Sequence, residues 1–221
     1  MPETRPEAIL QILRKTFPTP ERIAFGKKPF KTLIATIVSQ NTTDRNASKA
    51  FENLSKNFEI TPEALSEAKV GQIEQCIRVA GLQKNKVKTI KQVSTILLNT
   101  YQGDLRKVLS LPLEKARNTL MQMPGIGPKT ADVVLLFGAA KSTIPVDTHV
   151  DRVAKRLDLA PSNGGYEAVR QSLQSLYNSK DFLTVHVTLI SHGREYCKAG
   201  KPLCPQCPVN TLCPSEQLWD T

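Results

Sequence analysis

Four cysteines near the carboxyl end of the chain have the residue type and spacing of a metal site. Cys197, Cys204, Cys207 and Cys213 follow the pattern C-x6-C-x2-C-x5-C within seventeen residues. Cysteines this close together in one segment coordinate either zinc or an iron–sulfur cluster. Structural zinc sites are commonly built from two Cys-x2–4-Cys pairs, and this segment has one such pair. The spacing by itself leaves tetrathiolate zinc and [4Fe–4S] open.

The amino-terminal segment indicates that these cysteines stay reduced. Residues 1–16 are polar and have no apolar signal region, and no apolar run approaches 18 residues. We therefore expect no transmembrane helix and no membrane partner. An intracellular location follows, where disulfides are rare and thiols serve as metal ligands. The fifth cysteine, Cys76, lies beside Ile73 on an apolar face and is predicted to be a core residue.

A second chemical pattern is the sequence MPGIGPKT at residues 123–130. Glycines permit a positive φ and carry no Cβ that would obstruct a close approach. The pattern predicts a turn between two helices, the second running from Lys129 to Ala140. The first amides of such a helix form a phosphate site. Ile126 is expected to tuck inward, although Gly-x-Gly alone fits an ordinary helix–helix turn equally well.

Lys129 and Asp147 are candidates for a nucleophile and its assisting group. Lys129 falls in the first turn of a predicted helix, where the positive end of the dipole favours a neutral amine. A neutral amine can attack an electrophilic carbon and form a Schiff base. Asp147 precedes a helix predicted to begin at Thr148, where it fits an N-cap and can also act in catalysis. The 18 residues between Lys129 and Asp147 are enough for one helix and a return loop, so both can face one pocket. The alternative for Lys129 is a contact with phosphate or solvent.

The charge of the chain favours a polyanionic partner. The formal net charge is +10 and the isoelectric point is near 9.5, which suits nucleic acid better than a membrane surface. Aromatic residues make up only 5% of the chain, so a platform that stacks many single-stranded bases is not expected. The basic series Lys84, Lys86, Lys88 and Lys91 is predicted to follow a nucleic-acid backbone, with a solvated surface as the alternative.

Apolar residues recur with the helical period along most of the chain, and no segment alternates with period two. Turn signals at proline, glycine and asparagine clusters divide the sequence into about ten helices. We therefore predict an all-α fold with two lobes. Residues 29–140 form one lobe, and residues 1–28 plus 141–221 form the other, which carries the cysteine segment 197–213. No heptad or large apolar stripe stands out, so a monomer is expected.

The motifs together resemble those of the endonuclease III family of helix-hairpin-helix DNA glycosylases. The resemblance runs nearly end to end and includes SQNTTD at 39–44, Gly81-Leu82, the turn at 123–130, VDTH at 146–149, HGR at 192–194 and the four cysteines in order. It implies a two-lobe helical fold whose cysteine segment holds a [4Fe–4S] cluster. It also implies a DNA glycosylase with AP lyase activity, with double-stranded DNA containing a damaged base or abasic site as partner. Such an enzyme is expected in the cytoplasm, associated with the nucleoid.

The resemblance assigns roles to individual residues. The family's catalytic lysine falls at Lys129, and the aspartate that assists base departure falls at Asp147. The wedge residues that fill the space of a flipped base fall at Asn41 and Leu82. Many relatives have glutamine where Asn41 stands, and Gln40 lies one position earlier, so either can be the plugging residue. Leu82 can alternatively be a core residue, and Gln40 or Asn41 can cap the next helix. The residues expected to contact DNA are Gln40, Asn41, Leu82, Gly125, Ile126, Gly127, Thr130 and His149.

The resemblance also implies a class of substrate, and two alternative functions remain to be weighed against it. The implied substrates are oxidised or ring-saturated pyrimidines such as thymine glycol. A monofunctional mismatch glycosylase, removing thymine or uracil opposite guanine, is the alternative within enzymes. Such relatives commonly have tyrosine or serine in place of Lys129, so the lysine argues against it. A non-catalytic DNA-binding module is the alternative of another class, and the presence of both Lys129 and Asp147 argues against that.

Overall fold

The computed structural model describes residues 4–18 and 28–215, and within these ranges all regular secondary structure is helical. No helix in the described ranges combines the length and apolar character needed to cross a membrane. The chain divides into two compact units. We call Met1–Ile23 with Ser142–Thr221 the terminal unit, and Ala24–Lys141 the central unit.

The described residues form twelve α-helices, two more than the sequence suggested. The difference arises from helices of six and four residues, α4 and α7, which are too short to display an apolar period. The central unit contains α2 (Pro29–Ser39), α3 (Asp44–Asn57), α4 (Pro62–Glu67), α5 (Val70–Ile77), the 3-10 turn Arg78–Ala80, α6 (Gln83–Tyr101), α7 (Arg106–Leu109), α8 (Leu113–Met121) and α9 (Pro128–Ala139). The terminal unit contains α1 (Arg5–Thr16), α10 (Thr148–Arg156), α11 (Tyr166–Leu176), α12 (Phe182–Glu195) and the 3-10 turns Ser179–Asp181, Cys204–Gln206 and Asn210–Leu212.

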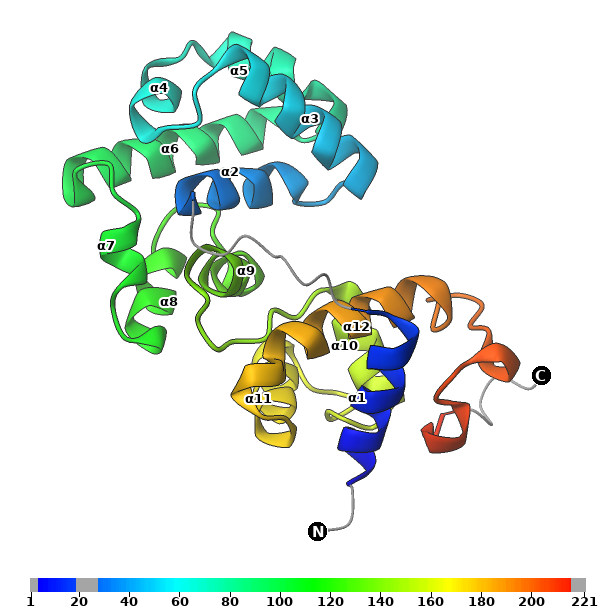
Figure 1. Cartoon of the computed structure of the whole chain (residues 1–221). Coiled ribbons are helices and arrows are strands. Elements are labelled where there is room, and N and C mark those ends of the chain that lie inside the picture. Colours follow the sequence, from blue (N-terminus) through cyan, green and yellow to red (C-terminus); the bar gives the residue numbers. More distant parts are fainter. Residues whose placement is uncertain (1–3, 19–27, 216–221) are drawn as a thin grey trace. The chain divides into compact units, whose positions relative to one another are not determined.

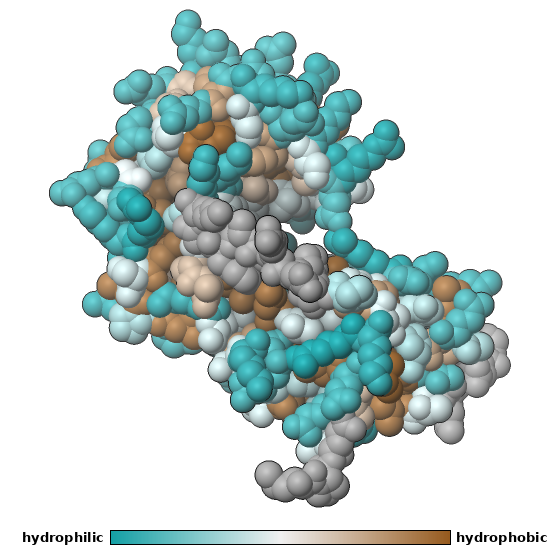
Figure 2. Space-filling model, in the orientation of Figure 1, coloured by the Kyte–Doolittle hydropathy of each residue, from teal (hydrophilic) through white to brown (hydrophobic). Residues whose placement is uncertain are grey.

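Helix α2 is the centre of the central unit's core. It packs against both α6 and α9, and Figure 1 shows it below the long helix α6. Leu33, Ile34, Ile37 and Val38 are all fully buried, because a helix with neighbours on several sides needs apolar residues on several faces. In the view of Figure 2, hydrophilic residues line the edge of this unit where α3, α4 and α5 lie.

The terminal unit is built on the packing of α1 and α10 against α12. Ile9 and Leu13 of α1 and Val153 of α10 share its buried core. Gly193 allows α12 to approach α10 closely, since a Cβ at Gly193 would lie 3.0 Å from the Cβ of His149 and 3.1 Å from a methyl group of Val153. Both distances are tighter than most contacts of a Cβ atom in proteins, so a larger residue at this position would require its neighbours to shift. A small residue at this point therefore sets the position of α10.

A buried ion pair joins α8 to α9. The Nε atom of Arg117 lies 3.1 Å from Oδ1 of Asp132, and the two side chains are only 7% and 0% exposed. Such a pair contributes little more to the free energy of unfolding than an apolar contact would. Removing one partner is costly, however, because the other charge then stays buried without its counter-ion. Loss of either partner is therefore expected to destabilise the packing of α8 against α9.

We expect Arg117→Met to destabilise the protein by about 3–5 kcal/mol, because the Asp132 carboxylate would stay buried without its cation. Urea unfolding followed by circular dichroism measures this loss. The matched control is Arg106→Met, which removes an arginine from an exposed pair with Asp104, where the arginine side chain is 75% exposed. That change should cost less than about 1 kcal/mol. Equal losses for the two variants would contradict the role assigned to burial.

Candidate active site and metal centre

The turn between α8 and α9 has the geometry that its glycines predicted. Gly125 adopts φ +74°, and a Cβ there would lie 2.4 Å from Oγ1 of Thr89 on α6. Ile126 is 4% exposed and its amide donates to the carbonyl of Met123, which confirms that it tucks inward. Gly127 is the N-cap of α9, and a Cβ there would meet nothing within 4 Å. The start of α9 is thus open to a ligand at Gly127.

Lys129 lies in the first turn of α9, as the sequence predicted. Pro128 occupies the first helical position, where proline is well tolerated because it needs no N–H. Lys129 follows it and is half-buried. Thr130 is buried, and its Oγ1 lies 3.2 Å from Nε2 of Gln40. Lys129 therefore lies between Pro128, whose ring fixes its φ, and Thr130, whose side chain is held by Gln40.

The structure gives Gln40 and Asn41 different environments. Gln40 donates from Nε2 to the carbonyl of Gly125, at 3.2 Å, and to Thr130, so its side chain braces the hairpin. Asn41 is exposed and adopts φ +51°. The alternative that either residue caps α3 is wrong, because the cap is Thr43, whose hydroxyl accepts from the amide of Asn46 at 3.3 Å. Asn41 is therefore the more accessible of the two.

Leu82 is a surface residue rather than a core residue. Its side chain is 55% exposed, and it adopts φ +49° directly after Gly81, which has φ +67°. A large apolar side chain in the left-handed region of backbone space is unusual and is held there only by surrounding structure. Leu82 is thus an exposed apolar tip at the start of α6.

Asp147 caps α10, as its position before Thr148 predicted. Its Oδ1 accepts from the amides of His149, at 2.9 Å, and Val150, at 2.8 Å. Since both bonds use Oδ1, the cap does not occupy Oδ2. The neighbouring acid Asp151 instead forms an ion pair with Lys155 at 2.8 Å. Nδ1 of His149 lies 3.1 Å from a guanidinium nitrogen of Arg152.

The basic series on α6 does not form one nucleic-acid face. Lys86 is 3% exposed, and its Nζ donates to the carbonyls of Val38 and Ala80, both at 2.9 Å. Lys91 donates to the carbonyls of two residues at the end of α4, at 2.6 Å each. The expectation for these two lysines was therefore wrong, whereas Lys84 and Lys88 are exposed. The helical period contained the signal, because Lys86 shares a face with the buried residues Ile90, Val93 and Leu97.

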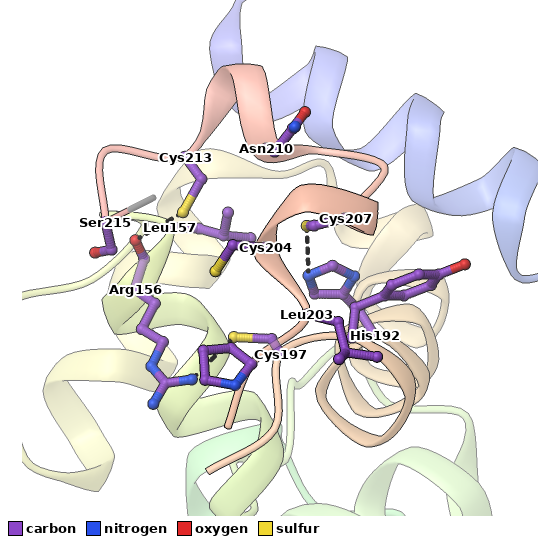
Figure 3. Close-up of a pocket in the computed structure, with 12 residues that line it drawn as sticks. Arg156, Leu157, His192, Cys197, Leu203, Cys204, Cys207, Asn210, Cys213 and Ser215 are labelled. Atoms are coloured by element: carbon purple, nitrogen blue, oxygen red, sulfur yellow. Dashed lines mark hydrogen bonds between the residues drawn. The ribbon is translucent and has the colours of Figure 1, made fainter. Parts of the chain in front are cut away.

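The four cysteines line one cavity of about 30 Å³ in the terminal unit. Figure 3 shows their sulfur atoms facing a common space, with Arg156 and His192 beside it. In the described ranges, no three His, Cys, Asp or Glu side chains gather closely enough to hold a single metal ion. The sulfur atoms therefore surround the cavity rather than one point. They belong to the segment Cys197–Cys213, which we call the cysteine loop.

Burial affects the ionisation of two of the four cysteine thiols. Burial, together with the neighbouring thiols, raises the pKa of Cys207 to about 11, and burial also raises the pKa of Cys213. Thiols in such surroundings ionise when a metal centre supplies positive charge. Nη1 of Arg156 lies 3.4 Å from the sulfur of Cys197. Nε2 of His192 lies 3.7 Å from the sulfur of Cys207. The donor set thus fits a metal centre, and Cys76 lies apart from it against the core of the central unit.

Arginines that the sequence analysis did not single out hold the cysteine loop. Arg152 donates to the carbonyl of Cys197 at 2.9 Å and to that of Gly193 at 2.8 Å. Arg156, four residues later on α10, donates to the carbonyls of Lys198 and Ala199. Arg5 of α1 donates to the carbonyl of Leu212 at 3.0 Å. The spacing of Arg152 and Arg156 puts both on one helix face, which is the signal that could have pointed to them.

The fold and the site define the class to which this molecule belongs. An all-helical chain with a glycine hairpin, a lysine at the following helix start and a cysteine loop is typical of helix-hairpin-helix DNA repair proteins. A family model described as "HhH-GPD superfamily base excision DNA repair protein" matches residues 34–179. The match spans more than half of the chain.

Comparison with individual proteins identifies relatives within this superfamily. Endonuclease III of Sulfolobus acidocaldarius is 39% identical over 185 residues, which cover 83% of this chain and 81% of that protein. Endonuclease III of Escherichia coli is 34% identical over 212 residues, covering 96% of both. A solved structure of a trapped covalent intermediate of endonuclease III with DNA matches 97% of this chain and 98% of its own, at 31% identity and a TM-score of 0.84.

The chain belongs to the endonuclease III family of the HhH-GPD superfamily. It is a DNA glycosylase with AP lyase activity that acts on DNA in base excision repair. A thermostable thymine-DNA glycosylase is also similar, with a TM-score of 0.79, but at 20% identity this likeness shows the fold alone.

Proposed function

We propose that this glycosylase removes oxidised or ring-saturated pyrimidines, such as thymine glycol, from double-stranded DNA and then cleaves the strand at the abasic site. The observation that carries the proposal is Lys129 in the first turn of α9, directly after an open glycine hairpin. The pyrimidine class rests on relatedness to the endonuclease III proteins. We further propose that the protein acts as a monomer in the cytoplasm, at the nucleoid.

The hairpin binds the DNA backbone near the lesion. The first four amides of a helix have no partner within it and carry the positive end of the dipole. Pro128 has no N–H, and the amide of Ile126 already donates to Met123. The donors available to a phosphate therefore come from Gly127, Lys129 and Thr130. Their position against the backbone leaves the side chain of Lys129 beside the sugar.

Lys129 and Asp147 divide the chemistry between them. As the bond from C1′ to the base breaks, its electron pair leaves with the base, and the carboxylate of Asp147 stabilises positive charge on the sugar or takes a proton from the amine. The amine of Lys129 bonds to C1′, and ring opening gives a Schiff base. Loss of a proton from C2′ then breaks the bond from C3′ to oxygen, which cleaves the strand on the 3′ side.

The cysteine loop holds a [4Fe–4S] cluster through Cys197, Cys204, Cys207 and Cys213. Its supports are the cavity that the four residues share and the presence of only one Cys-x2-Cys pair in the segment. When bound, such a cluster links the four thiolates and stabilises a loop with little secondary structure of its own. The cluster has a structural role in this proposal, and base removal uses other residues.

The Schiff base is tested with a duplex that contains one thymine glycol. We expect borohydride to trap a covalent complex with the wild-type protein and none with Lys129→Gln, because the amide cannot attack C1′. The measurement is a denaturing gel, with Lys115→Gln, an exposed lysine on α8, as control. Base release that gives breaks only after alkali would indicate a monofunctional glycosylase. Neither trapping nor release would indicate a different lesion or a DNA-binding module.

The role of Asp147 is tested separately from its cap. Asn is as good an N-cap as Asp, so Asp147→Asn should keep the free energy of unfolding while base release slows by about a hundredfold or more. In the same variant, the rate of strand cleavage at a preformed abasic site should fall less than the rate of base release, because no base has to leave. Single-turnover kinetics on both substrates provide the measurement, with Asp147→Ala as the variant that also loses the cap. Base release by Asp147→Asn at the wild-type rate would refute the assignment.

Metal analysis of purified protein tests the cluster. We expect brown protein that contains iron and acid-labile sulfide in equal amounts, since zinc thiolates are colourless. Replacing any of the four cysteines of the loop with serine should remove the colour and destabilise the fold. Cys76→Ser is the control and should keep both iron and colour. Purified protein that contains zinc and no iron would overturn this part of the proposal.

A further inference from the structure

We propose that Lys86 is a positioning residue that holds the loops of Asn41 and Leu82 at a fixed spacing, so that both can enter a DNA duplex together. The inference rests on the proposed function and concerns residues of the central unit alone. Lys86 itself contacts no reacting atom in this proposal. It acts through the main chain of the two loops.

The contacts of Lys86 connect two segments that are distant in sequence. Its Nζ donates at 2.9 Å to the carbonyl of Val38 and at 2.9 Å to that of Ala80. Val38 precedes Asn41 by three residues, and Ala80 precedes Leu82 by two. Figure 1 shows the carboxyl end of α2 and the amino end of α6 on the same side of this unit. One ammonium group therefore bonds to the main chain of the two turns that lead into these loops.

The two carbonyls need a donor of this kind. The last carbonyls of a helix have no partner within it and carry the negative end of the dipole. Val38 lies in the last turn of α2, and Ala80 ends the 3-10 turn before Gly81. Lys86 is 3% exposed, so water has little access to the space between them. A lysine with several donors can satisfy both carbonyls from one position.

The loop tips need fixing because their backbone is strained. Asn41 and Leu82 adopt φ of +51° and +49°, values that residues other than glycine seldom adopt. Such conformations persist where the surrounding structure determines them. Both side chains are exposed, so packing of the side chains does not supply that support. The shared bond partner of the two loops, Lys86, supplies it through the backbone.

Helix α6 extends the same support to the hairpin. Lys86 and Thr89 are three residues apart on α6 and so lie on one face of the helix. Thr89 packs against Gly125, and Gln40 donates to the carbonyl of that same glycine. The hairpin and both loops are thus braced against one helix. This arrangement suits a protein that must grip a backbone and fill a vacated base position at the same time.

The test uses the full-length protein with Lys86→Met, which keeps the length of the side chain and removes its donors. A duplex must be opened by the wedge, whereas a single strand needs no wedge. We expect borohydride trapping at an abasic site to slow by about tenfold or more in a duplex and to stay within about twofold in a single strand. The readout is the ratio of the two rates, which a uniform loss of folded protein would not change.

Lys91→Met is the matched control. Lys91 lies on the same helix and donates to the carbonyls of Ser66 and Ala68, which adjoin neither loop. Its replacement should lower stability in the same way but leave the rate ratio at the wild-type value. If Lys86→Met folds poorly, Lys86→Gln, which keeps a donor for one carbonyl, should give an intermediate ratio. An unchanged ratio in a folded Lys86 variant, or equal changes for Lys86 and Lys91, would overturn the proposal.

A binding readout separates this inference from the chemistry. 2-Aminopurine placed opposite a tetrahydrofuran abasic analogue changes its fluorescence when the wedge unstacks it, and no bond is broken. We expect the change with wild-type protein and with Lys91→Met, and its loss with Lys86→Met at saturating protein. If the wild-type protein gave the fluorescence change but no borohydride trapping, and Lys86→Met lost the change, the proposed lyase would be contradicted while the role of Lys86 would be supported. A full fluorescence response from Lys86→Met would refute that role.

Discussion

Helix ends, with the backbone groups that they leave unpaired, are the constraint on which this structure depends. An all-helical chain has many such ends, and each leaves amides or carbonyls without a partner inside the helix. The side chains that matter here lie at those ends. Asp147 accepts from the first amides of α10, and Lys86 donates to the last turn of α2. The open start of α9, next to Lys129, is the end at which we propose that a phosphate of DNA binds.

The unpaired carbonyls at helix ends and in loops also engage part of the chain's positive charge. A net charge of +10 indicates an affinity for nucleic acid, but several cations are used on the protein's own carbonyls. Arginines and lysines suit that task because they carry several donors and oppose the negative end of a helix dipole. They still contribute to the long-range attraction of DNA. The residues in this group are Arg5, Lys86, Lys91, Lys141, Arg152 and Arg156.

Local patterns predicted the features that depend on a few neighbouring residues. The helical class, the inward turn of Ile126 and the cap at Asp147 follow from periodicity and from propensities at helix ends. Features that depend on distant segments were missed. The bonds of Lys86 join positions 38 and 80, and Gln40 meets a glycine 85 residues later. Short helices such as α7, with four residues, lack the length that a period requires.

The positions of Asn41 and Pro128 have physical consequences for the two proposed DNA contacts. Gln40 is held by the hairpin, so Asn41, with its shorter side chain, is the residue exposed at the tip of its loop. As the plugging residue of the proposal, Asn41 would reach less far into a duplex than glutamine, and it would depend more on a rigid loop to position it. Pro128 removes one amide from the phosphate site while it preorganises the start of α9. At Asn41 the fixed backbone would offset the shorter side chain, and at Pro128 it would offset the missing N–H. Helix α6 supports both the loop of Asn41, through Lys86, and the hairpin, through Thr89, so it is central to how the chain would engage DNA.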